Sequence, residues 1–167
     1  YKKDFFKFDE KQKITFFKKL ILNKNKFIKD TILKNKENKE VWSTFKTLSN
    51  EPPECLGAYV ISMTNSASDI LAVNFLQKEA KIKNKLRVVP LFETLEDLIN
   101  AKSIMETLFS QKWYRNLIKN KQEGMIGYSD SSKDAGKLCA SWHQYKAQEE
   151  IIKLAKKYKI KVIFFHG

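Results

Sequence analysis

Two acidic side chains and a lysine stand where apolar runs of this sequence end. Glu93 follows the run RVVPLF at 87–92, while Asp130 and Lys133 follow the run GMIGY at 124–128. Carboxylate oxygens are the ligands that magnesium and manganese favour. If the two runs are neighbouring parallel strands, their ends meet at one edge of a sheet and the two carboxylates lie close together. The pattern therefore predicts a divalent-cation site, with the Lys133 ammonium placed to hold an anion beside it.

A second interpretation of the same residues needs no ligand. Ser131 and Asp134 have the spacing of a capping box, with Asp in place of the usual Glu or Gln, and Glu93 could cap a helix that begins at Leu95. Two carboxylates that lie close together at one edge repel each other unless a cation neutralises the pair. The spacing alone leaves both the metal site and the helix caps open.

The elements that must position these side chains alternate along the second part of the chain. Short apolar runs of strand type are separated by helical patterns. The expected strands are 58–63, 87–92, 124–128 and 161–165, and the expected helices are 66–80, 95–111 and 133–158. Runs that are apolar throughout are typical of parallel strands covered on both faces. We predict an α/β fold, a partial β/α (TIM-type) barrel with four parallel strand–helix units.

The first part of the chain differs in composition and in its residue pattern. It is rich in lysine and has apolar residues at helical spacing, with Asp9 placed to cap the first helix. Two further helices are expected, one through Phe27, Ile28, Ile32 and Leu33 and one through Trp42, Phe45 and Leu48. Pro52 and Pro53 then break the helical pattern. We predict a helical segment at 1–54, followed by the partial barrel at 55–167.

The composition limits the class of protein. The 167 residues are 43% hydrophobic and 31% charged, which indicates a globular chain, and the net charge is +13. This charge raises the alternative of a basic nucleic-acid-binding module, but the lysines are scattered and often adjoin asparagine, as solvated lysines do. We expect no nucleic-acid partner. The chain has no apolar run of about 18 residues, no signal peptide and no disulfide or metal spacing of its two cysteines, so we expect a cytoplasmic protein without a membrane partner.

Seven motifs, in this order and at these spacings, resemble the phosphoenolpyruvate carboxylase family. They are AYVISM, SDILAVNFLQKEA, RVVPLFETLEDL, WYRNLI, GYSDSSKDAG, YKAQEE and FFHG. The resemblance is clear from about Val41 to Gly167 and weaker over the first 40 residues. It implies a lyase that carboxylates phosphoenolpyruvate with bicarbonate, giving oxaloacetate, which replenishes the tricarboxylic acid cycle, and phosphate. It also implies a requirement for Mg²⁺ or Mn²⁺, an eight-stranded β/α barrel and a homotetramer of full-length subunits.

The resemblance assigns roles to particular residues. Glu93 and Asp130 match the family's metal ligands, and Lys133 matches a catalytic residue associated with bicarbonate. His166 matches a catalytic-site histidine near the phosphate. The family reaction forms an enolate that must be kept from water, and a metal bound by the two carboxylates would stabilise its oxygen.

Two apolar residues match the family's pocket for the methylene group of the substrate. These are Leu91 and Met125. Leu91 lies two residues before Glu93, so an extended strand points both side chains to the same side. We expect this pocket to exclude water from the reacting enolate.

The sequence also departs from the family pattern. It stops at Gly167, before the arginine- and glycine-rich loop that grips phosphate in the family, and Asn65, Ser66 and Ala67 stand where a threonine–proline pair is common. Both ends look cut, and we expect the 167 residues alone to have no carboxylase activity. The alternative to a piece of a working enzyme is a catalytically dead remnant that acts only as an interaction piece.

Overall fold

The computed structural model describes residues 5–23, 25–28 and 35–167. The chain divides into two compact units. The first unit comprises Tyr1–Ala58 and Ser68–Leu86, and the second comprises Tyr59–Ala67 and Arg87–Gly167. The chain therefore leaves the first unit, returns to it for one helix, and then completes the second.

The first unit is helical in its described residues. Its elements are the 3₁₀ turns η1 (Phe5–Lys7) and η3 (Pro53–Cys55) and the helices α1 (Glu10–Leu22), α2 (Lys36–Asn50) and nearly all of α3 (Ala67–Glu79). Asp9 caps α1, because its carboxylate accepts the backbone N–H of Gln12 at 2.8 Å while the Gln12 side chain accepts the N–H of Asp9 at 3.0 Å. This reciprocal capping box confirms the predicted start of the first helix.

Aromatic rings form the core between α1, α3 and the segment that follows α1. Phe75 lies 6.0 Å from Phe17 and 5.9 Å from Phe27, measured between ring centroids. Phe27 and Ile28 are not helical, so the helix expected through them is wrong at these two residues. The other two residues expected in it, Ile32 and Leu33, lie outside the described part of the chain.

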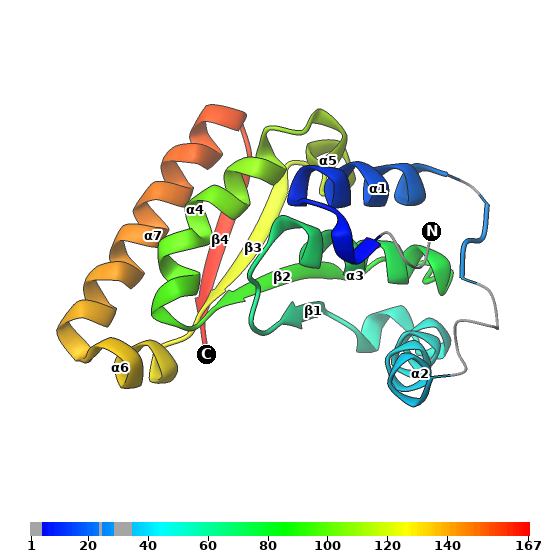
Figure 1. Cartoon of the computed structure of the whole chain (residues 1–167), viewed down its shortest axis with the longest axis horizontal. Coiled ribbons are helices and arrows are strands. Elements are labelled where there is room, and N and C mark those ends of the chain that lie inside the picture. Colours follow the sequence, from blue (N-terminus) through cyan, green and yellow to red (C-terminus); the bar gives the residue numbers. More distant parts are fainter. Residues whose placement is uncertain (1–4, 24, 29–34) are drawn as a thin grey trace. The chain divides into compact units, whose positions relative to one another are not determined.

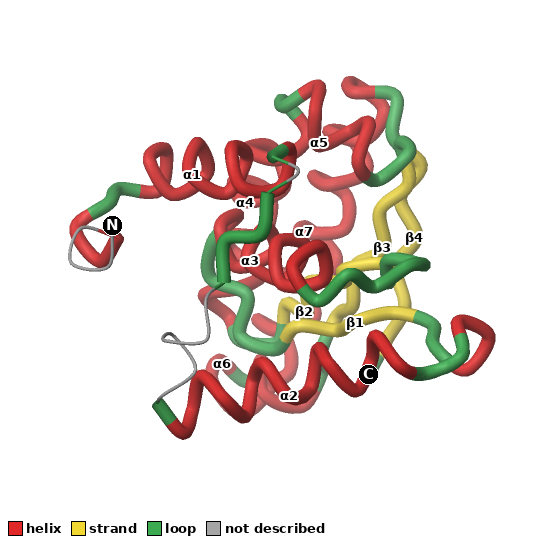
Figure 2. The backbone as a smooth tube through the Cα atoms, turned by 90° about the vertical axis from the view of Figure 1, so that its right-hand side faces the viewer, coloured by secondary structure: helices red, strands yellow, loops and turns green. Residues whose placement is uncertain are grey.

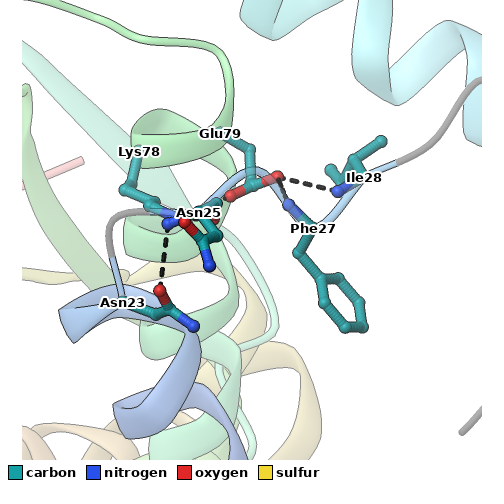
Figure 3. Close-up of polar contacts among 6 residues, drawn as sticks. All are labelled: Asn23, Asn25, Phe27, Ile28, Lys78 and Glu79. Carbon is teal, nitrogen blue, oxygen red and sulfur yellow. Dashed lines mark hydrogen bonds and ion pairs between the residues drawn. The ribbon is translucent and has the colours of Figure 1, made fainter.

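A buried carboxylate binds the backbone N–H groups of Phe27 and Ile28 (Figure 3). The Glu79 side chain is fully buried, and its Oε2 accepts the backbone N–H groups of Phe27 at 2.7 Å and Ile28 at 2.8 Å. Its Oε1 pairs with the Lys78 ammonium at 2.7 Å, which also donates to the carbonyl of Asn25 at 2.8 Å. Burial alone raises the pKa of Glu79, but these hydrogen bonds outweigh it and lower the pKa below its ordinary value.

The second unit is built on one sheet (Figure 1). The strands are β1 (Ala58–Ile61), β2 (Arg87–Phe92), β3 (Lys121–Ile126) and β4 (Lys161–His166), in the spatial order β1-β2-β3-β4. The pairings of β2 with β3 and of β3 with β4 are parallel. The helices are α4 (Leu95–Phe109), α5 (Lys112–Leu117), α6 (Ser129–Ala135) and α7 (Lys137–Tyr158). The predicted α/β class and parallel sheet are confirmed.

Helices α4 and α7 lie side by side, with α4 in contact with β2 and α7 in contact with β4 (Figures 1 and 2). Their buried residues recur at helical spacing and face the sheet or each other. In α4 they are Asp97, Leu98, Ala101, Ile104, Met105, Leu108 and Phe109; in α7 they are Ala140, Gln144, Ala147, Ile151, Leu154 and Ala155. One member of each set is polar, Asp97 in α4 and Gln144 in α7.

Strand β3 begins three residues before the predicted run. The extra residues include Gln122, which is 4% exposed and polar. Its amide donates to the carbonyl of Val88 at 3.0 Å and its carbonyl oxygen accepts the hydroxyl of Tyr114 at 2.8 Å. Burial raises the pKa of Tyr114. Because the polar groups of Gln122 are satisfied inside the core, a strand can start at residues that look like loop in the sequence.

The long helix predicted at 133–158 is two helices. Gly136 separates α6 from α7 with a φ of 77°, a backbone conformation that residues with a Cβ rarely adopt. α6 begins at Ser129, four residues before the predicted start, so Asp130 and Lys133 both belong to this short helix. Within the described residues, none of the helices combines the length and apolar character needed to cross a membrane.

Candidate metal and anion site

Glu93 lies directly after β2, and α4 holds its backbone in place. The carboxylate of Asp97 accepts the backbone N–H groups of Glu93 at 3.3 Å and Thr94 at 3.1 Å, while the Thr94 hydroxyl accepts the N–H of Asp97 at 3.1 Å. Thr94 is therefore the cap of α4, and the predicted capping role of Glu93 is wrong. A threonine is already present at the capping position, which frees the Glu93 side chain for another task.

The Glu93 carboxylate is only partly used by the protein. Its Oε1 accepts the backbone N–H of Met63 at 3.1 Å, from the loop after β1. Within the described part of the chain, the Glu93 side chain makes this one hydrogen bond, so its Oε2 is available to bind a ligand. Residue Glu93 is half-buried, so a ligand can reach it from solvent.

Gly127 brings the end of β3 against Glu93. Its N–H donates to the carbonyl of Phe92 at 3.0 Å. A Cβ built on Gly127 would lie 2.7 Å from the Cβ of Glu93 and 3.5 Å from Cδ1 of Leu91. Such a distance is too short for two carbon atoms, so only glycine allows this approach. The two strand ends therefore meet as the sequence predicts.

Asp130 and Lys133 form an ion pair on α6. Their side-chain atoms Oδ1 and Nζ are 3.2 Å apart, and the side chains are 47% and 76% exposed. The exposed pair can exchange its partner for a ligand at small cost, because solvent already screens it. The two groups thus offer an acidic oxygen and an ammonium group at one point of the surface.

Ser131 does not cap a helix as predicted. It lies inside α6, fully buried, and its hydroxyl donates towards the carbonyls of Gly127 at 3.3 Å and Tyr128 at 3.2 Å. α6 begins without a side-chain cap. The predicted capping role of Ser131 is therefore wrong, and its hydroxyl is used inside the fold.

Sequence reasoning missed the partner of Ser131. The amide of Gln144, from α7, donates to the Ser131 hydroxyl at 2.9 Å and to the carbonyl of Gly127 at 3.3 Å. Gln144 is 4% exposed. The signal was available in the sequence, because Gln144 interrupts an otherwise apolar stripe that includes Ala140, Ala147 and Ile151. A glutamine at such a position must find hydrogen-bond partners inside the protein.

Leu91 and Met125 are neighbours in the sheet. Their Cα atoms are register partners in the β2–β3 pairing, so both side chains point to the same face as Glu93. Both are half-buried. The Met125 methyl group occupies the space where any side chain at Gly167 would lie. An apolar patch therefore adjoins the carboxylate of Glu93.

His166 stands apart from this group. The register pairs Phe165 with Met125 and His166 with Ile126, so alternation points the His166 side chain to the opposite face from Leu91 and Met125. The exposed imidazole packs against the ring of Tyr128, with 5.0 Å between centroids. The structure thus brings together Leu91, Met125 and Glu93, pairs Asp130 with Lys133, and places His166 beside the turn that leads to Asp130.

The donor set suits a hard divalent cation. Within the described residues, no group of three or more His, Cys, Asp or Glu side chains is arranged to hold a metal. Carboxylate oxygens suit Mg²⁺ or Mn²⁺, which often keep several non-protein ligands, and do not suit a structural zinc site, which takes Cys and His ligands.

Comparison with known proteins gives a consistent result. The profile of the phosphoenolpyruvate carboxylase family matches residues 1–167. The chain is 58% identical over 134 residues to phosphoenolpyruvate carboxylase 3 of Arabidopsis thaliana and 55% identical over 137 residues to phosphoenolpyruvate carboxylase of Acinetobacter baylyi. These matches cover 80% and 82% of this chain but 14% and 15% of the relatives. The chain therefore spans about one seventh of their length.

Proposed function

Because the chain belongs to the phosphoenolpyruvate carboxylase family, we propose that it supplies part of the catalytic site of an enzyme that carboxylates phosphoenolpyruvate with bicarbonate. The products would be oxaloacetate and phosphate. One observation carries the proposal: the ends of two adjacent parallel strands lead to Glu93 and to Asp130 with its paired Lys133. The carboxyl ends of parallel strands are where α/β enzymes place their chemistry.

The wider architecture belongs to the same proposal. The four strands and their helices would form half of a β/α barrel, at residues 55–167, with the helical segment 1–54 before it. The order β1-β2-β3-β4, in which each strand lies next to its successor in sequence, is the order such a barrel requires. A homotetramer of longer subunits in the cytoplasm is the expected context.

Glu93 and Asp130 would hold Mg²⁺ or Mn²⁺. Glu93 has a carboxylate oxygen without a protein partner in the described structure, and the Asp130 carboxylate has only the exposed Lys133 ammonium beside it. When bound, the cation supplies positive charge close to the enolate oxygen. The Lys133 ammonium, 3.2 Å from Oδ1 of Asp130, balances the charge of that carboxylate.

The remaining residues would act on the anions and on water. The Lys133 ammonium would bind and orient bicarbonate by charge-assisted hydrogen bonds. His166 would contact the phosphate group of the substrate. Leu91 and Met125 would cover the methylene carbon and exclude water, which otherwise protonates the enolate and gives pyruvate in place of oxaloacetate.

The test is to replace each carboxylate in the full-length protein. Glu93→Ala and Asp130→Ala should each reduce metal-dependent oxaloacetate formation by at least about 100-fold, because loss of a preorganised charged group at a reacting centre costs that much. Thermal unfolding should change little, since neither carboxylate is fully buried. Oxaloacetate is measured by coupling to a malate dehydrogenase reaction.

A surface carboxylate provides the matched control. Glu106 of α4 pairs with Lys157 at 3.4 Å and is also exposed, so Glu106→Ala removes a carboxylate–lysine pair away from the strand ends. It should leave turnover unchanged. Full activity in the Glu93 or Asp130 variant would refute the assignment of that residue.

A further inference from the structure

We propose that Gln144 is a positioning residue for the candidate metal site. Together with Ser131, it fixes the turn that carries Asp130 and Lys133, and so sets where the Asp130 carboxylate stands relative to Glu93. This inference rests on the proposed function, because it concerns the geometry of the same two carboxylates.

The buried amide of Gln144 reaches the turn from another helix. Its Nε2 donates to two oxygens, the Ser131 hydroxyl at 2.9 Å and the Gly127 carbonyl at 3.3 Å. The Gly127 carbonyl can only accept, so the amide must present its NH₂ group and not its oxygen. The Ser131 hydroxyl accepts from Gln144 and donates its own proton towards the backbone of the turn. Gln144 thus ties α7 to Gly127 before Asp130 and to Ser131 directly after it.

Gly127 links this network to Glu93. Its carbonyl accepts from Gln144, while its N–H donates to the carbonyl of Phe92, the residue before Glu93. Its missing side chain lets the backbone approach within contact of Glu93. One residue therefore joins the end of β2, the end of β3 and helix α7. A displacement of the Gly127 carbonyl moves the turn to Asp130 without any direct contact between Gln144 and the carboxylates.

The other carboxylate has an equivalent anchor. Asp97 of α4 is 3% exposed and accepts the backbone N–H of Glu93, as Gln144 of α7 donates to the backbone before Asp130. In both cases, a buried polar side chain from a later helix holds the backbone at a strand end. The helices α4 and α7 pack against each other. Two rigid elements in contact thus each position one of the two carboxylates.

A metal site is sensitive to such support. Residues that orient metal ligands without touching the metal typically change metal affinity by about 10- to 100-fold when replaced. Methionine has nearly the volume of glutamine but no N–H group. Gln144→Met therefore keeps the packing of α7 and removes both hydrogen bonds to the turn.

The experiment measures Mn²⁺ binding to the full-length protein by electron paramagnetic resonance, without substrate. We expect Gln144→Met to weaken Mn²⁺ binding about tenfold per folded molecule. Ser131→Ala, which keeps the hydrogen bond from Gln144 to Gly127, should weaken it by a smaller factor. If Gln144→Met does not fold, the Mn²⁺ affinity of Ser131→Ala decides the question. In that case, a Mn²⁺ affinity of Ser131→Ala equal to that of the parent protein would overturn the proposal.

Gln77 provides the control for general destabilisation. It is also fully buried, and its amide exchanges two hydrogen bonds with the backbone of Leu86, at 2.7 and 3.2 Å, in the first unit. Gln77→Met should lower the melting temperature and leave Mn²⁺ affinity unchanged. Equal loss of affinity in the Gln77 and Gln144 variants would assign the effect to stability and refute a positioning role.

The same assay separates this inference from the proposed function. If Glu93→Ala and Asp130→Ala bind Mn²⁺ as tightly as the parent protein, the metal site itself is wrong. If those variants lose Mn²⁺ while folded Gln144→Met keeps parental affinity, the metal site stands and only the positioning role of Gln144 is refuted.

Discussion

Each unit of the chain holds a lysine beside a carboxylate, and the two pairs differ in distance, burial and further hydrogen bonds. In the first unit, the Lys78–Glu79 pair has an N–O distance of 2.7 Å, and its side chains are 16% and 0% exposed. In the second unit, the Lys133–Asp130 pair has a distance of 3.2 Å, with exposures of 76% and 47%. Glu79 uses both oxygens on the protein, since Oε2 also binds two backbone N–H groups. No comparable backbone bond to Asp130 is seen in the described structure.

The difference separates a carboxylate that holds the fold from one that is free to bind. A buried charge is retained only when its hydrogen bonds are satisfied, so Glu79 has no capacity left for a ligand. An exposed ion pair contributes little to stability and can rearrange around a cation. The presence of lysine next to a carboxylate therefore does not by itself indicate function. Burial and the number of satisfied oxygens distinguish the two cases.

The largest effect should come from removing the lysine of the exposed pair. We expect Lys133→Met to lower turnover of the full-length enzyme about 100-fold, because the ammonium group that we propose orients bicarbonate is lost. Mn²⁺ affinity should stay within about fivefold and shift towards tighter binding, since a positive charge beside Asp130 has gone. The measurements are oxaloacetate formation and Mn²⁺ titration.

The matched variant is Lys78→Met in the buried pair. It should lower the free energy of unfolding and leave turnover per folded molecule as in the parent protein. If Lys78→Met impairs turnover and Lys133→Met does not, the distinction between the two pairs is wrong.

An intermediate effect is expected where the strand ends touch. Gly127→Ala would place a Cβ 2.7 Å from the Cβ of Glu93, so one of the two backbones must shift. We expect Mn²⁺ affinity to fall about tenfold and the free energy of unfolding to fall by about 1–3 kcal/mol. Gly57→Ala is the control, because no atom lies within 4 Å of a Cβ at that position. Parental Mn²⁺ affinity in folded Gly127→Ala would show that the close approach is not needed.

Glu79→Gln should have the smallest effect on function, because we expect it to change only the stability of the fold. The neutral amide loses the ionic bond to Lys78 and weakens the bonds to Phe27 and Ile28. We expect a loss of about 1–3 kcal/mol in the free energy of unfolding at pH 7, with Mn²⁺ affinity unchanged. Chemical denaturation of both proteins gives the difference.

The pH dependence of that difference tests the cause. The pKa of Glu79 is lower in the folded protein than in the unfolded chain, so its contribution to stability is complete above the ordinary value of about 4.5. It is lost as the pH falls through the folded value. The difference in stability between the parent protein and Glu79→Gln should therefore shrink as the pH falls below that ordinary value. A difference that stays constant from pH 7 to pH 3 would contradict a charged, hydrogen-bonded Glu79.

Local sequence patterns were enough for much of the fold. The apolar run at 87–92 coincides with β2, and the start of α4 at Leu95 was also predicted. The elements that were misjudged owe their structure to distant partners. Phe27 and Ile28 have helical spacing, yet their N–H groups bind Glu79, about fifty residues away. No periodicity within a short window reports such a bond.

Residue types at strand ends gave the candidate site, because carboxylates that follow apolar runs are visible in the sequence. The roles of the supporting residues were not visible in this way. Gln144 interrupts an apolar stripe in the sequence, but only the packing of α4 and α7 shows that Asp97 and Gln144 are both buried and bonded to strand ends. The cap expected from Ser131 failed for the same reason, since its hydroxyl meets carbonyls and an amide that only the folded chain brings near it.

The sequence by itself determined the parallel α/β class, the family resemblance and the three charged residues that would bind metal and anion, because these depend on residue type and local spacing. Only the tertiary structure decided which carboxylates are free. Glu79 and Asp130 each stand near a lysine in sequence, but burial and backbone N–H groups satisfy the first, while the second stays exposed. Hydrogen bonds and desolvation act through space, so they follow from the packing and not from the order of the residues.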